Sequence, residues 1–212
     1  MSGRFVVIEG IDGAGTTTQV GRLVDRLRKK NIQARGTREP SDGPVGTLIR
    51  QVLAGRVVVP GGRAPGWATM ALLFAADRVD HVEAEIEPAL EIGAVVVSDR
   101  YDASSLAYQS VTSGGGGDAA VKWIAEINRQ ARRPDLTVVL DVSADIASAR
   151  REARGEPAQL YEQNETQRAL VVFYKELARY LPQDRIVLVD ASGTADQVEE
   201  AVYAAYKAAF PV

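Results

Sequence analysis

A glycine-rich stretch near the start of the chain restricts the fold more than any other feature. It runs from Gly10 to Thr18 and reads GIDGAGTTT, which matches the phosphate-loop pattern G-x-x-x-x-G-K-[ST] except that Thr16 occupies the lysine position. Glycines let successive backbone N–H groups point inward around an anion, and the following helix adds its positive N-terminus. The stretch therefore predicts a strand, a phosphate-binding loop and a helix, without the positive charge that a lysine supplies.

The pattern of apolar residues along the chain predicts an α/β fold. Short continuous apolar runs, as in strands of a parallel sheet covered on both faces, occur at 5–8, 32–37, 94–98, 136–142 and 186–189. Segments with helical spacing lie between them, at 17–30, 45–53, 67–90, 102–109, 118–130, 144–154, 165–180 and 195–209. We therefore expect one three-layer α/β/α domain over residues 1–212, with about five parallel strands and right-handed crossovers.

Charge and composition argue against several other classes of protein. The formal net charge of −3 at pH 7 argues against a general nucleic-acid-binding protein, which would carry a basic surface. The absence of cysteine excludes disulfides and thiolate chemistry, and the single histidine, His81, argues against a histidine-rich zinc site. We find no signal peptide and no apolar run as long as a membrane span, so a cytoplasmic enzyme without a membrane partner is expected.

Charged residues follow two of the predicted strands, where an open parallel sheet forms its ligand crevice. Arg38 comes after the second strand and can bind a phosphate with two parallel hydrogen bonds. Asp99 comes after the third and is well placed to hold Mg²⁺, with Arg100 beside it to bind anions. The alternatives are a surface arginine at position 38 and a strand-end ion pair between Asp99 and Arg100.

Two predicted helices carry side chains suited to a base and a sugar. Phe74 and Arg78 are four residues apart on one face, so the ring can stack on a base while the guanidinium donates to its acceptor edge. The next helix carries two hydroxyls, a phenol and an amide within two turns, from Ser104, Ser105, Tyr108 and Gln109. The alternatives are a core phenylalanine with a solvated arginine, and a solvent-facing helix N-terminus.

Three arginines cluster later in the chain, at Arg150, Arg151 and Arg154. They precede a Gly-Glu-Pro sequence at 155–157, which is typical of a mobile segment that closes over phosphates. Glu152, which lies between them, supports the alternative of a solvated charged face.

In this order, these segments resemble the thymidylate kinases. The matching stretches are FVVIE at 5–9, the glycine-rich segment at 10–19, TREP at 37–40, LLFAADRVDH at 72–81, IEPAL at 86–90 and DRYDASSLAYQ at 99–109. The resemblance implies a P-loop kinase fold with a short arginine-rich lid at about 150–162. It also implies a homodimer that transfers the γ-phosphoryl of ATP to dTMP with Mg²⁺, in dTTP biosynthesis.

The resemblance further implies roles for individual residues. The ATP phosphates would be held by Gly10, Gly13, Ala14, Gly15, Thr16, Thr17 and Thr18. The dTMP would be held by Arg38, Phe74, Arg78, Arg100, Ser105, Tyr108 and Gln109. The implied catalytic residues are Asp12, Asp99, Arg100, Arg150 and Arg154. The implied metal-binding residues are Thr17, Asp12, Asp99 and Glu162.

The chain departs from the family pattern at three places. Thr16 replaces the lysine, residues 41–43 (Ser-Asp-Gly) replace the usual glycine pair after TREP, and the segment 110–117 lacks an arginine that the family often carries. Our hypothesis is that one of the three clustered arginines takes the place of the lysine. The alternatives are a nucleotide-binding protein with impaired catalysis and a kinase for another nucleoside monophosphate.

Overall fold

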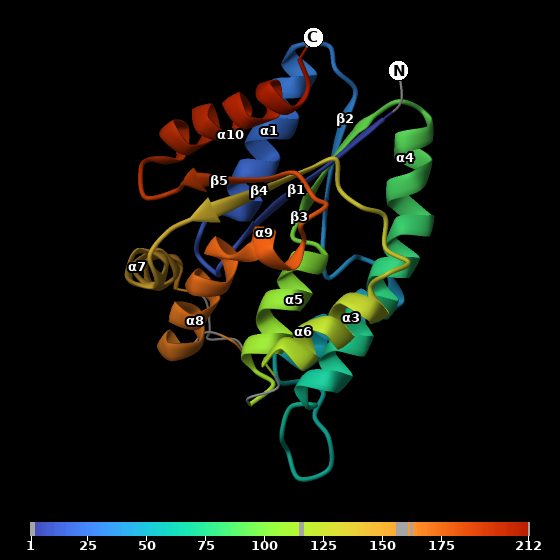
Figure 1. Ribbon diagram of the computed structural model, residues 1–212, viewed down its shortest axis with the longest axis vertical. Helices are drawn as coiled ribbons and strands as arrows, with labels where there is room; N and C mark the ends of the chain where they lie inside the picture. Colours follow the sequence, from blue (N-terminus) through green and yellow to red (C-terminus); the bar gives the residue numbers. More distant parts are fainter. Residues whose placement is uncertain (1–2, 115–116, 156–160, 162, 212) are drawn as a thin grey trace.

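Five parallel strands form the centre of the structure, a computed structural model that describes residues 3–114, 117–155, 161 and 163–211 (Figure 1). The strands are β1 (Arg4–Gly10), β2 (Ala34–Arg38), β3 (Val95–Asp99), β4 (Leu136–Asp141) and β5 (Ile186–Asp190). Their order across the sheet is β2-β3-β1-β4-β5, and every neighbouring pair is parallel. The predicted parallel sheet is confirmed. Strands β2 and β3 lie on one side of β1, and the later strands β4 and β5 lie on the other. The carboxyl end of β1 is therefore a topological switch point, where α/β sheets bind ligands.

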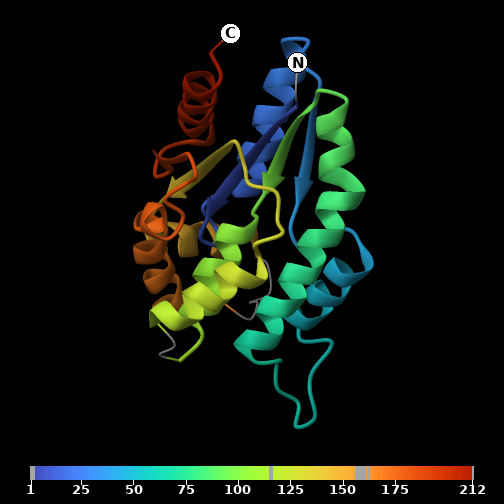
Figure 2. The same ribbon diagram turned by 45° about the vertical axis from the view of Figure 1, so that its right-hand side comes forward.

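Helices cover both faces of this sheet (Figures 1 and 2). Their bounds are α1 (Thr16–Lys29), α2 (Pro44–Leu53), α3 (Trp67–His81), α4 (Glu87–Glu91), α5 (Asp102–Val111), α6 (Gly117–Ile127), α7 (Ala144–Arg154), α8 (Asn164–Lys175), α9 (Leu177–Tyr180) and α10 (Ala195–Ala209). Alternate β1 residues point to opposite faces. Val6 and Ile8 therefore join the cluster that includes α1, whereas Phe5 and Val7 join the one that includes α4. No helix in the described part of the chain is long and apolar enough to cross a membrane.

The long helix predicted over 67–90 is interrupted. A π-helical turn, η1 (Val82–Ile86), separates α3 from α4, so the prediction of one regular α-helix is wrong there. Pro88 explains the wider turn, because proline has no N–H to donate and its ring clashes with the carbonyl of the residue four positions earlier. The segment predicted as one helix over 165–180 likewise divides into α8 and α9.

Candidate active site

The predicted phosphate loop lies between β1 and α1. Gly15 precedes the first residue of α1 in a left-handed conformation, with φ of 100°, which glycine adopts without steric cost. Thr16 is that first helical residue, and its side chain is buried at 6% exposed. The lysine position of the loop therefore carries a short, buried and neutral side chain.

Helix α7 packs directly against this loop. A Cβ atom at Gly13 would collide with the backbone carbonyl of Ala147 in α7. Two neighbouring α7 arginines also donate to loop carbonyls: Arg150 to Ala14 at 3.5 Å, and Arg151, which is buried, to Asp12. The loop and the start of the predicted lid thus form one packed unit.

Of the residues predicted in the lid as catalytic or metal-binding, only Arg150 has a described side chain. Arg150 also donates to the carbonyls of Ser192 and Gly193, at 3.4 and 3.0 Å, so its guanidinium lies between the phosphate loop and the segment after β5. Arg154 belongs to α7, but its side chain is not among those described. Glu162 and residues 156–160 also lie outside the described residues. Their predicted roles remain predictions.

Two predicted metal ligands lie together. The Thr17 hydroxyl donates to Asp99 Oδ2 at 2.5 Å, and Asp99 Oδ1 is buried without a hydrogen-bond partner among the described residues. A hydroxyl oxygen beside a carboxylate oxygen that lacks a partner fits a hard cation such as Mg²⁺. The described residues contain no group of three or more acidic or histidine side chains suited to a metal. Phosphate oxygens and water would therefore complete the coordination.

The Asp12 carboxylate binds Arg100, and its predicted role as a metal ligand stays a prediction. Arg100 Nη2 lies 2.6 Å from Asp12 Oδ1, and Nη1 donates to the Gly10 carbonyl at 2.8 Å and to Ser104 Oγ at 3.2 Å. Burial acts to lower the pKa of Arg100, but Tyr108 and Asp12 beside it outweigh this effect, so the pKa lies well above its ordinary value. Arg100 is thus a fixed cation between the phosphate loop and α5.

A cavity of about 150 Å³ opens next to Arg100. Most of the residues predicted to bind a base and a sugar line it: Phe74, Arg78, Arg100, Ser105, Tyr108 and Gln109, together with Ser104 and Asp12. Because Ser105, Tyr108 and Gln109 are buried, the alternative of a solvent-facing helix is wrong. The structure adds lining residues that sequence reasoning missed: Glu39, Pro40, Leu53, Tyr101 and Tyr161.

Polar atoms of the cavity are left unpaired. Among the described residues, Arg78 Nε, Gln109 Oε1 and the Tyr108 hydroxyl are buried without a hydrogen-bond partner. Buried polar groups are normally satisfied, so unpaired ones in a cavity indicate a polar ligand. Arg78 and Gln109 thus offer one donor and one acceptor in the cavity that Phe74 also lines.

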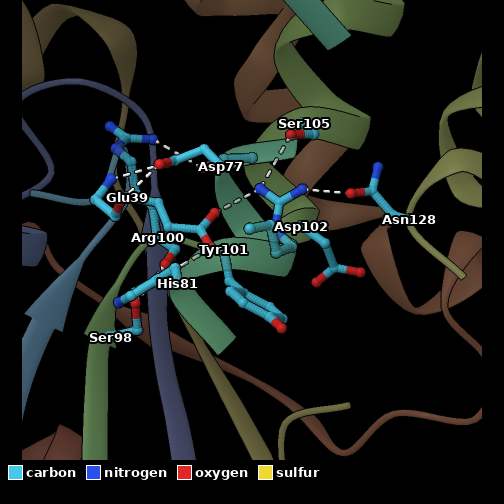
Figure 3. A network of polar contacts seen from close by, with 12 residues as sticks. Glu39, Asp77, His81, Ser98, Arg100, Tyr101, Asp102, Ser105 and Asn128 are labelled. Atoms are coloured by element: carbon cyan, nitrogen blue, oxygen red, sulfur yellow. Dashed lines mark hydrogen bonds and ion pairs between the residues drawn. The ribbon is translucent and has the colours of Figure 1, made fainter. Parts of the chain in front are cut away.

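Arg78 is held by three side chains from three other segments, Glu39, Ser105 and Asn128, which are labelled in Figure 3. Its Nη2 lies 2.5 Å from Glu39 Oε2 and 3.2 Å from Ser105 Oγ, and its Nη1 donates to Asn128. Burial opposes the charge, yet Glu39 raises the pKa of Arg78 above its ordinary value. Arg78 is 1% exposed, so the alternative of a solvated arginine is wrong.

His81 lies behind this network rather than in the cavity. Its Nε2 is 2.7 Å from Thr37 Oγ1, and its Nδ1 is 3.4 Å from Glu39 Oε1. His81 thus has a structural role, because its ring connects Thr37 of β2 to the Glu39 carboxylate that binds Arg78.

Arg38 is not among the residues that line the cavity, and its predicted role at the dTMP phosphate stays a prediction. Its guanidinium binds the Asp42 carboxylate at 2.7 Å, with side chains 59% and 67% exposed. The neighbouring Ser41 is buried and donates through N and Oγ to Asp77, at 2.8 and 2.6 Å. The Ser-Asp-Gly sequence at 41–43 thus has a structural role in this turn. Ser41 ties the turn to α3 through Asp77, and Asp42 binds Arg38.

Glu9, at the end of β1, was missed in our prediction of the site. Its carboxylate accepts hydrogen bonds from Tyr101 N at 2.8 Å, Ser104 N at 3.2 Å, Ser104 Oγ at 2.7 Å and the Tyr174 hydroxyl at 3.0 Å. Complete burial raises the pKa of Glu9 to about 7, although Arg100 and these donors act to lower it. The signal available in the sequence was a carboxylate directly after the apolar run at 5–8, because a buried carboxylate needs hydrogen-bond partners.

Comparison with known proteins agrees with this geometry. A family model for thymidylate kinase matches residues 8–202. Proteins named thymidylate kinase from Symbiobacterium thermophilum and Thermomicrobium roseum are each 39% identical, over 92% and 94% of this chain and 89% and 92% of their own. A protein of Pyrococcus abyssi named "Probable thymidylate kinase" is 39% identical over 98% of this chain and 97% of its own. Since these matches span the phosphate loop, the cavity and α7, the chain belongs to the thymidylate kinase family of phosphotransferases.

Proposed function

We propose that this protein transfers the γ-phosphoryl of ATP to dTMP, giving ADP and dTDP. The observation that carries the proposal is the cavity beside the phosphate loop, where Phe74 offers a stacking face and Arg78 and Gln109 an unpaired donor and acceptor. A thymine ring carries the complementary carbonyl and N–H groups. The names of the relatives support the same substrate.

The chemistry requires positioning rather than a general base. A phosphate monoester, with a second pKa of about 6, is largely ionised at neutral pH and attacks without losing a proton. Catalysis then rests on aligning two anions and neutralising charge on the group transferred. We assign Arg100 to the acceptor phosphate, because it reaches from the cavity to the phosphate loop. Thr17 and Asp99 would hold Mg²⁺, which supplies charge neutralisation at the donor phosphates.

A coupled assay with ATP, Mg²⁺ and a panel of nucleoside monophosphates tests this proposal. We expect turnover with dTMP well above that with dCMP, dGMP and dAMP, because the Arg78 and Gln109 pair suits a carbonyl and an N–H of thymine. A higher specificity constant for another monophosphate would favour the alternative kinase. Binding of ATP and dTMP without turnover would favour the alternative of impaired catalysis that Thr16 raises.

Replacing Asp42 by glycine should lower the KM for dTMP, by up to about fivefold, with kcat little changed. Asp42 competes with the acceptor phosphate for Arg38, and an exposed ion pair of this kind contributes roughly 0.2–1 kcal/mol. Steady-state kinetics measures the change. Glu176→Gln, which removes an acid from an exposed pair with Arg179, is the matched control and should leave KM unchanged. Equal KM values for the two variants would contradict a competition between Asp42 and the acceptor phosphate for Arg38.

We also propose a cytoplasmic homodimer, in line with the family and with the nucleotide substrates. Leu72 and Val79 lie seven residues apart on α3 and are 51% and 39% exposed. That spacing places both on the same outer face of the helix, where a second copy would cover them.

A further inference from the structure

The phosphate loop obtains no positive charge from its own helix. Thr16, Thr17 and the residue after them are neutral, and the first basic residue of α1 is Arg22. Arg22 binds Asp196 at 2.5 Å and Glu199 at 3.1 Å on α10. The charge that a lysine at position 16 would bring to the donor phosphates must therefore come from another element.

Arg100 is unsuited to that task. Its guanidinium is paired with the Asp12 carboxylate at 2.6 Å and lines the cavity on the acceptor side. A phosphoryl transfer between two anions needs positive charge on the donor as well as on the acceptor.

Helix α7 brings two arginines to the loop with described side chains, and they lie at different places. Arg150 binds Ala14 and the carbonyls of the segment after β5, which lies away from the acceptor cavity. Arg151 binds the carbonyl of Asp12, the loop residue whose side chain pairs with Arg100 and lines the cavity. Arg151 therefore lies against the loop residue that joins the phosphate loop to the acceptor cavity.

Arg151 is also held in place before any substrate arrives. It is 8% exposed, and the packing of Ala147 on Gly13 fixes the helix that carries it. A guanidinium has five N–H donors, and the one bond to a described residue uses a single donor, which leaves others for phosphate oxygens. A charge positioned in advance stabilises a transition state without reorganisation during the reaction.

We propose that Arg151 replaces the missing phosphate-loop lysine and stabilises the phosphoryl group as it passes from donor to acceptor. In this step the bond between the γ-phosphorus and the ADP oxygen breaks as a bond to a dTMP phosphate oxygen forms, and no proton is transferred. Arg150 is instead a positioning residue for the donor nucleotide. The inference rests on the proposed phosphoryl transfer.

Charge complementation between positions 16 and 151 tests the inference. Arg151→Met should lower kcat roughly 10²–10³-fold, as expected for a preorganised charge, while the KM for dTMP changes little. Adding Thr16→Lys to Arg151→Met should recover much of that loss. Thr16→Lys alone should change kcat far less, because the wild type already has the charge. Arg150→Met is the matched comparison, and its loss should not be recovered by Thr16→Lys.

Three outcomes would overturn the proposal: near-normal turnover by Arg151→Met, a loss that Thr16→Lys does not recover, or equal recovery of both arginine variants. Thermal unfolding of each variant identifies losses caused by misfolding, and Arg151→Lys, which retains charge and volume, should then keep part of the activity. ATP affinity by calorimetry gives a second readout, which should fall in Arg151→Met and recover with Thr16→Lys. A wild type without turnover on any monophosphate would refute the proposed function, while the affinity changes still test Arg151.

Discussion

Replacing Arg78 by methionine should lower the free energy of unfolding by about 3–5 kcal/mol, the usual cost of removing one partner from a buried ion pair. Arg78 and Glu39 are 1% and 2% exposed, so the Glu39 carboxylate would stay buried without its cation. Methionine fills much of the same space, so the loss reports charge rather than a cavity. Urea unfolding of the wild type and the variant measures it.

The double variant Arg78→Met/Glu39→Gln is the control for this prediction. It leaves no unpaired charge, so it should be more stable than Arg78→Met alone, and the difference between the two isolates the cost of the lone carboxylate. A loss below about 1 kcal/mol in Arg78→Met, the range of exposed pairs, would contradict the prediction.

The stability of the wild type should fall as pH rises from about 4.5 to about 7, through the titration of Glu9. The ordinary pKa of this carboxyl is 4.5, and burial raises it to about 7 in the folded protein. Over that range the folded state keeps a proton that the unfolded chain has lost, so raising the pH favours unfolding. The shift corresponds to a loss of about 3 kcal/mol above pH 7 relative to acid conditions.

Glu9→Gln should remove this pH dependence. The oxygen of the introduced amide would still accept from Tyr101 N and Ser104 N, and its nitrogen would donate to the Ser104 and Tyr174 hydroxyls, which both act as acceptors. The variant should therefore match the wild type near pH 4.5 and exceed its stability near pH 8. Urea unfolding at both pH values provides the test, and a constant difference between the two proteins would contradict it.

The order of strands and helices and the position of the pocket were predictable because they depend on local patterns. Glycines at positions 10, 13 and 15 identify the loop, and the spacing of Phe74 and Arg78 identifies one helix face. Since parallel strands end at one edge of the sheet, residues after β1 and β3 had to meet there. These relations need no knowledge of distant contacts.

The remaining features depend on contacts between distant segments. Asn128 lies 50 residues from the Arg78 that it binds, and nothing near it in the sequence signals that contact. The ion pair between Arg38 and Asp42 was not predictable, because it depends on how the turn at Ser41 is tied to α3. The hydrogen-bond partners of Arg150 lie in the segment after β5, more than 40 residues later in the sequence.

At Gly13 the phosphate loop touches the backbone of Ala147 in α7. The main chain of α7 occupies the place where a loop side chain would otherwise stand. The loop thus supplies backbone dipoles and the helix supplies cationic side chains, and neither part forms the donor site alone. A side chain at position 13 would push α7 away from the loop and displace Arg150 and Arg151 together. Glycine is therefore needed at this position for the packing of α7 as well as for nucleotide binding.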